Sequence, residues 1–175
     1  MGATLKQIAY YLTQQNREYT KLAEGCIAVD AALGNGDKLA ITITLQENGE
    51  YLEIAAPQLL QGVKGKVNQS ALFQAMLAIS WKTRLLRWQY ANGEVLGAIG
   101  FPLERTSQRE ILSEAQFNAA LNGFVSLMNY IIPRLEAVLE TGECLAEEEA
   151  EELPRLNLPE IFRPESLDIF KRGAA

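Results

Sequence analysis

The sequence contains no histidine, and its two cysteines, Cys26 and Cys144, lie far apart and form no CxxC pair. Without histidine the chain has no imidazole for a Ser-His-Asp or Cys-His catalytic site, for metal ligation or for a pH switch near neutrality. Two cysteines without histidine are also too few for a four-ligand zinc site. We therefore predict no catalytic, cofactor-binding or metal-binding residues, and we expect that the protein is not an enzyme.

Long apolar runs are also missing. No stretch reaches the ~20 consecutive apolar residues that a membrane-spanning helix needs. The most apolar candidate, residues 117–139, is interrupted by asparagines, a proline, an arginine and a glutamate. The first eight residues carry one lysine and no apolar run, so we expect no signal peptide. Since the cytosol keeps such thiols reduced, these features predict a cytoplasmic protein with no membrane partner.

The excess of negative charge is confined to one stretch. The formal net charge is −6, from 16 basic and 22 acidic residues. Six acidic residues lie in residues 143–152, which leaves 22 − 6 = 16 acidic residues against 16 basic ones in the rest of the chain. A neutral body lacks the basic surface that general nucleic-acid binding requires. We therefore expect no nucleic-acid partner, and we interpret the glutamate block as a solubilising charge run, because EF-hand spacing is missing.

Hydrophobic periodicity predicts eight elements. They are a helix over 4–23, strands over 26–33, 38–46 and 51–56, a helix over 71–80 after an N-cap at Asn68, strands over 84–90 and 95–101, and a helix over 113–140. Short turns join neighbouring strands, so these strands must run antiparallel. We expect the second strand pair to flank the Asn92-Gly93 turn, and Ser113 with Gln116 to form a capping box. The order α-β-β-β-α-β-β-α predicts an α+β fold with a single twisted antiparallel sheet and helices packed on it.

The C-terminal segment differs in composition from the rest. We predict one α+β domain over residues 1–142, followed by an acidic hinge and a proline-containing apolar tail over 143–175. Prolines keep the residues before them extended and forbid a regular helix. The tail is too apolar for an inert linker, so we expect it to dock or to bind a partner. Its candidate partner-binding residues are Leu156, Leu158, Ile161 and Phe162.

One block of the sequence carries a family resemblance. A helix leads into Trp81-Lys82-Thr83-Arg84-Leu85-Leu86-Arg87-Trp88-Gln89-Tyr90, which is followed by an Asn-Gly hairpin and a strand that ends in Phe101-Pro102-Leu103-Glu104. A long helix with Asn129-Tyr130-Ile131-Ile132-Pro133 near its end follows. This pattern resembles the YbjN-like family, whose fold is that of the type III secretion chaperones. The resemblance covers roughly the first 140 residues as an order of elements, and it implies a homodimer that holds a partner polypeptide.

Trp81, Arg84 and Arg87 are further candidates for partner binding, because indoles among cations can grip a peptide or a nucleic-acid strand by stacking and charge. The alternative is structural. Strand alternation favours a core position for Trp88, with Arg87 on the opposite face of the strand. Trp81, at the end of the preceding helix, is the freer of the two indoles.

We therefore predict a non-enzymatic protein-binding module that acts as a chaperone, adaptor or assembly factor for a partner protein or peptide. The small residues on the second face of the first three strands could receive a partner segment, another copy of the chain or the tail. A regulator of signalling through a partner protein is an alternative. A small-molecule-binding enzyme that uses carboxylates and lysines is another, although Lys64 and Lys66 lack the spacing of a phosphate-binding loop.

Overall fold

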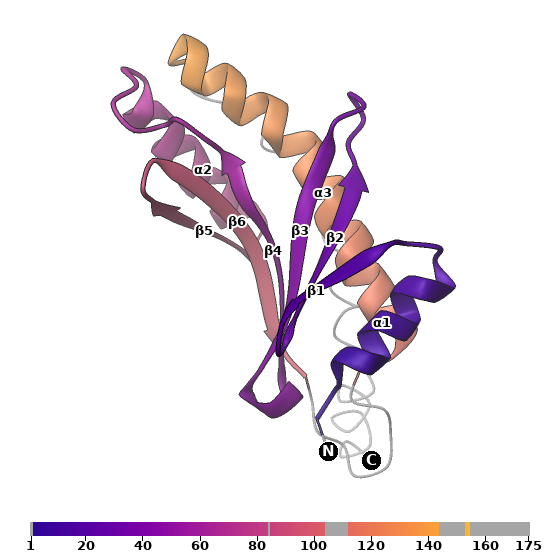
Figure 1. Ribbon diagram of the computed structural model, residues 1–175. Helices are drawn as coiled ribbons and strands as arrows, with labels where there is room; N and C mark the ends of the chain where they lie inside the picture. Colours follow the sequence, from indigo (N-terminus) through magenta and orange to yellow (C-terminus); the bar gives the residue numbers. More distant parts are fainter. Residues whose placement is uncertain (1, 84, 104–111, 144–152, 155–175) are drawn as a thin grey trace, which may run out of the picture.

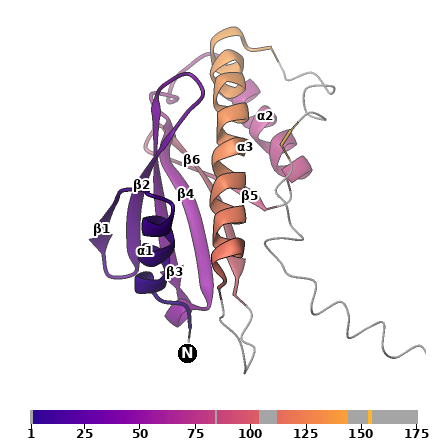
Figure 2. The ribbon, with the colours of Figure 1, turned by 90° about the vertical axis from the view of Figure 1, so that its right-hand side faces the viewer.

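The described part of the chain forms one six-stranded antiparallel sheet with three helices on one of its faces (Figures 1 and 2). The computed structural model describes residues 2–83, 85–103, 112–143 and 153–154. In chain order the elements are α1 (Leu5–Gln14), β1 (Tyr19–Ala23), β2 (Cys26–Ala32), β3 (Lys38–Gln46), the 3-10 turn η1 (Glu47–Gly49), β4 (Tyr51–Leu60), α2 (Gln69–Thr83), β5 (Leu86–Ala91), β6 (Glu94–Pro102) and α3 (Glu114–Thr141). The strand order is β1-β2-β3-β4-β6-β5. The predicted α+β fold with a single antiparallel sheet is confirmed.

The prediction of one helix over 4–23 is wrong beyond residue 14. Asn16 adopts a left-handed backbone conformation, with φ +54°. Its N–H donates to the carbonyl of Thr13 and the N–H of Arg17 donates to that of Leu12, both at 3.0 Å. This pair of hydrogen bonds is a Schellman motif, which ends a helix. The chain then enters β1, which pairs with β2 and adds a sixth strand at the edge of the sheet.

Pro57 does not end its strand, contrary to the prediction. β4 continues to Leu60, and its register with β6 shifts between Ala56 and Leu60. Gln58 has φ +55° within this irregular stretch. A bulge tolerates proline because the bulged residues do not need to donate to the ladder. The extended strand brings Leu59 and Leu60 into the buried core.

The C-terminal half of the sheet is built around β6. Asn92 and Gly93 both have positive φ, at +55° and +87°, which confirms the predicted tight hairpin between β5 and β6. β6 also pairs with β4, with Ile54 opposite Ile99. Because β6 lies between β4 and β5, the chain crosses over it through α2, and β5 forms the second edge of the sheet.

The long helix α3 supplies most of the helical side of the core. Ser113 and Gln116 form the predicted capping box, and Gly142 ends the helix in the left-handed conformation. The inner face of α3 is buried along its length, with Phe117 and Phe124 as its largest fully buried side chains. α1 and α2 both contact α3, so the three helices form one layer (Figure 2). Within the described part of the chain, no helix combines the length and apolarity that crossing a bilayer requires.

Trp88 packs against the core on the helix side of β5, as strand alternation predicted. Its indole N–H donates to the carbonyl of Met76 in α2 at 2.8 Å. Gly97 lies beneath the ring, and a Cβ atom there would lie only 2.9 Å from a ring carbon of Trp88. The absence of a side chain at Gly97 therefore lets the indole approach β6 closely.

Candidate protein-binding surface

α2 is apolar on two opposite sides, and only one of them is buried. Its inner side places Leu72, Ala75, Met76 and Ile79 in the core. On its outer side, Leu77 and Trp81 are 71% and 86% exposed. Phe73, one turn before Leu77, is half-buried. Because residues four apart lie on one side of a helix, these three side chains form a continuous apolar line on the surface.

Tyr90 extends this line onto the edge strand β5. Its ring centroid lies 5.1 Å from that of Phe73 in an edge-on arrangement. Its hydroxyl accepts a hydrogen bond from the Gln69 side chain at 3.0 Å, which fixes the ring beside the start of α2. We call Phe73, Leu77, Trp81 and Tyr90 the α2 stripe. The stripe therefore runs along α2 and ends at an edge of the sheet.

The helix that carries most of the α2 stripe has little charge of its own. Lys82 is the one charged residue within α2. Tryptophan and tyrosine dominate the energetics of protein interfaces, because each buries a large area at a low cost in side-chain entropy. An apolar patch with these residues is typical of an interaction site, whereas scattered single exposed apolar residues need no such explanation.

Arg87 does not join Trp81 in one patch. It lies on the side of β5 opposite Trp88, where its guanidinium forms an ion pair with Glu53. It also donates to the Tyr51 hydroxyl at 3.3 Å and lies 5.9 Å from the centroid of the Tyr51 ring. Glu53 thus balances the charge of Arg87. The predicted grouping of Trp81 with Arg87 is therefore divided between two surfaces.

The second face of the sheet carries a row of small side chains. In register across five strands lie Ala28, Thr42, Ala55, Ala98 and Arg87. Ala55 and Ala98 are 3% and 0% exposed, although both lie outside the core cluster that the described residues form. None of the three described helices covers this face (Figure 2). The small side chains form a low surface, and the charged Arg87–Glu53 pair lies beside them on the same face.

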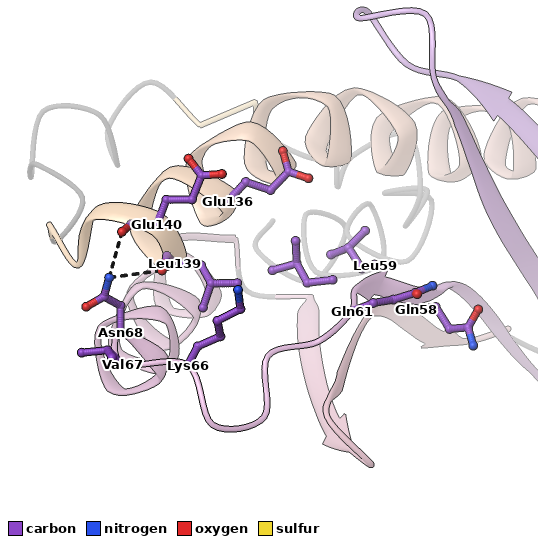
Figure 3. A pocket seen from close by; sticks show the side chains of 10 residues that line it. Gln58, Leu59, Gln61, Lys66, Val67, Asn68, Glu136, Leu139 and Glu140 are labelled. Carbon is purple, nitrogen blue, oxygen red and sulfur yellow. Dashed lines mark hydrogen bonds between the residues drawn. The ribbon is translucent and has the colours of Figure 1, made fainter.

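A groove with a volume of about 730 Å³ lies between the end of β4, the segment before α2 and the last turns of α3 (Figure 3). Glu136 and Glu140 project from α3 at one side of it, and Lys66 lies at the other (Figure 3). All three side chains are exposed to solvent. An enzyme that uses carboxylates and lysines would need such groups in a cleft where burial shifts their proton affinities. Exposed groups of this kind do not favour acid–base chemistry.

Asn68 closes one end of the groove in a way that the sequence did not reveal. α2 begins directly after Asn68, as the predicted N-cap required. Its side-chain amide, however, donates to the carbonyls of Leu139 and Glu140, at 3.2 and 3.0 Å (Figure 3). These carbonyls belong to the last turn of α3, where no intrahelical partner is left for them. Asn68 therefore ties the start of α2 to the end of α3.

The remaining site predictions have different outcomes. Arg84, Leu156, Leu158, Ile161 and Phe162 lie outside the described residues. Within the described ranges, no group of three or more cysteine, aspartate or glutamate side chains could hold a metal ion. Cys26 is a free, half-buried thiol on β2.

Comparison with protein-family models, with curated proteins and with solved structures finds no match for this chain. The resemblance to the YbjN-like family and to the type III secretion chaperones therefore stays a prediction from the sequence. What defines the candidate site is its own geometry: among the described residues, the α2 stripe brings exposed Leu77, Trp81 and Tyr90 together with half-buried Phe73 on two neighbouring elements.

Proposed function

We propose that the protein is a non-enzymatic protein-binding module, acting as a chaperone, adaptor or assembly factor in the cytoplasm, and that the α2 stripe contacts its partner. The exposure of Trp81 and Leu77 on a helix whose other side is in the core carries this proposal. An exposed indole is costly to leave in water, and about 25 cal/mol is gained for each Å² of apolar surface that a partner covers. The edge of β5, next to the stripe, can also pair with an extended segment of the partner.

A protein partner fits the stripe better than a small molecule does. The stripe lies on the surface of a helix, and none of its four residues lines the groove of Figure 3. Small ligands are usually bound in concave sites that enclose most of their surface. A regulator of signalling would use the same stripe to contact its partner, so this alternative differs in the partner's role and not in the site.

Site-specific photo-crosslinking in the native cell tests the proposal. A benzoylphenylalanine in place of Trp81 is expected to crosslink to one or a few defined proteins. The matched control carries the same group in place of Tyr10, which is 58% exposed on α1 and lies outside the stripe. Identical crosslinked products from both positions, or none from position 81, would count against the stripe as the partner site.

We also propose the homodimer that the sequence predicted, with the second copy on the uncovered face of the sheet. The small side chains of Ala28, Thr42 and Ala55 support this placement, because they leave room for a second sheet to pack face to face at about 10 Å. The Arg87–Glu53 ion pair lies on the same face, so the second copy packs beside it. Light scattering coupled to size exclusion is expected to give twice the mass of the chain for the wild type. Thr42→Arg, in the middle of the row, is expected to give the monomer mass, while Asn35→Arg in the exposed β2–β3 turn leaves the dimer intact. A monomeric wild type would show that the homodimer prediction is wrong.

A further inference from the structure

The chain returns to the helix layer after α3. Leu153 is only 8% exposed and belongs to the same cluster of buried apolar residues as the inner faces of the helices. Figure 2 shows residues 153–154, the short yellow segment, on the helix side of the sheet and at the height of α2. The last 21 residues therefore start from the side of the molecule that carries the α2 stripe, and not from the uncovered face of the sheet.

The segment that follows has the reach and composition to cover the stripe. Residues 155–162, from the residue after Pro154 to the end of the apolar run at Phe162, form a segment of eight residues. In an extended conformation they span about 25 Å, at about 3.1 Å per residue. α2 has 15 residues, which corresponds to a length of about 22 Å at 1.5 Å per residue. The run contains Leu156, Leu158, Ile161 and Phe162 and a single acidic residue, Glu160.

We propose that the C-terminal segment of residues 155–162 docks on the α2 stripe of its own chain and competes there with the partner protein. This inference rests on the proposed function, because it makes the tail a regulator of the same surface. Leu153 anchors the segment beside the helices, and the prolines at 154 and 159 limit the conformations that it loses on docking. The partner must displace the segment before it can contact Trp81.

Because the C-terminal segment is covalently tethered, even a weak contact with the α2 stripe is enough to keep the stripe covered. A short flexible connection gives an effective concentration of about 1 mM. A segment that would bind in trans with a Kd of about 100 µM is then docked in about 90% of molecules. Only about a tenth of the protein is open to the partner, so the apparent Kd for the partner is raised about tenfold.

Tryptophan emission in the full-length chain tests the docking. Leu158→Asp together with Phe162→Asp is expected to release the segment and to shift the emission to longer wavelength, because Trp81 becomes hydrated. Asn157→Asp, a polar neighbour in the same segment, is the matched control and leaves the emission unchanged. The same pair of substitutions is expected to cause no shift in a Trp81→Phe chain, where Trp88 is the one remaining indole.

The outcomes separate the docking from the proposed function. No shift in the chain with both indoles overturns the docking, and so does an equal shift in the Trp81→Phe chain. An emission that changes on dilution of the wild type means that a second copy covers the stripe, which also overturns the proposal. If the shift is found and the released chain crosslinks to its partner about ten times more at position 81, regulation is supported. If the shift is found but no partner crosslinks in either chain, the docking holds and the proposed function fails.

Discussion

Phe124→Ala is expected to lower the free energy of unfolding by about 3–5 kcal/mol, the range found when a buried phenylalanine is truncated to alanine. Phe124 is 0% exposed on the inner face of α3 and belongs to the core cluster. Its removal costs the transfer energy of the ring and leaves a cavity that neighbouring helices and strands cannot fill without moving. Since domains of this size are stable by only about 5–15 kcal/mol, the loss is a large fraction of the total. Chemical denaturation followed by circular dichroism measures it.

The control for this experiment is Leu77→Ala in the α2 stripe. Leu77 is 71% exposed, so in a chain whose C-terminal segment is released by Leu158→Asp and Phe162→Asp its truncation is expected to change the free energy of unfolding by no more than about 0.5 kcal/mol. A loss in that chain as large as the loss for Phe124→Ala would show that a second copy covers Leu77 in solution. A loss of less than about 1 kcal/mol for Phe124→Ala would contradict the core position of its ring.

Leu77→Gln combined with Trp81→Gln is expected to weaken partner binding by a factor of about 100, which corresponds to about 2.7 kcal/mol. Exposed aromatic anchors at the centre of an interface account for losses of this size. Glutamine is a good helix former, and both positions face solvent. The change therefore removes the contact surface and leaves the fold. Titration of the partner identified by crosslinking, with calorimetry as the readout, gives the two dissociation constants.

Ala78→Gln provides the matched substitution. Ala78 is exposed on the same helix, next to Leu77 in sequence, but it is not part of the α2 stripe. The Ala78→Gln substitution introduces the same side chain without removing an apolar anchor. The dissociation constant for the partner is therefore expected to stay within about twofold of the wild-type value. Equal binding by all three proteins would mean that the partner contacts another surface.

The order of the elements from residue 26 onward follows from local signals. Asparagine–glycine turns, alternating side chains and the Ser113 capping box each act within a few residues of one another, so the sequence carries them directly. The wrong prediction of helix over residues 15–23 also came from a local signal, the helical spacing of apolar residues. Tyr19 and Leu22 continue the helical spacing of the first segment, but the left-handed Asn16 ends the helix. The competing strand is stabilised by tertiary contacts, namely its pairing with β2 and the packing of Tyr19 against the core.

The candidate site was predictable in part. Trp81 was chosen as the freer indole, and the structure exposes it. The stripe as a whole was not found from the sequence, because α2 carries apolar residues on both of its sides. Which side of such a helix is covered depends on tertiary packing. The role of Asn68 was missed for a similar reason, since its hydrogen bonds reach residues 71 and 72 positions away in the sequence.

The position of β6 between β4 and β5 sets a sequence of events during synthesis. Strands β1 to β4 can pair as soon as they are made, because each lies next to the strand before it in the chain. The second edge of β4 has no partner until β6 is synthesised, and β6 begins 34 residues after Leu60. At about 5–20 residues per second, the ribosome needs about 2–7 s to supply them. During this interval the half-made sheet exposes the backbone edge of β4 and an uncovered apolar face, so we infer that the nascent chain is most prone to aggregation before its own final strand and α3 arrive.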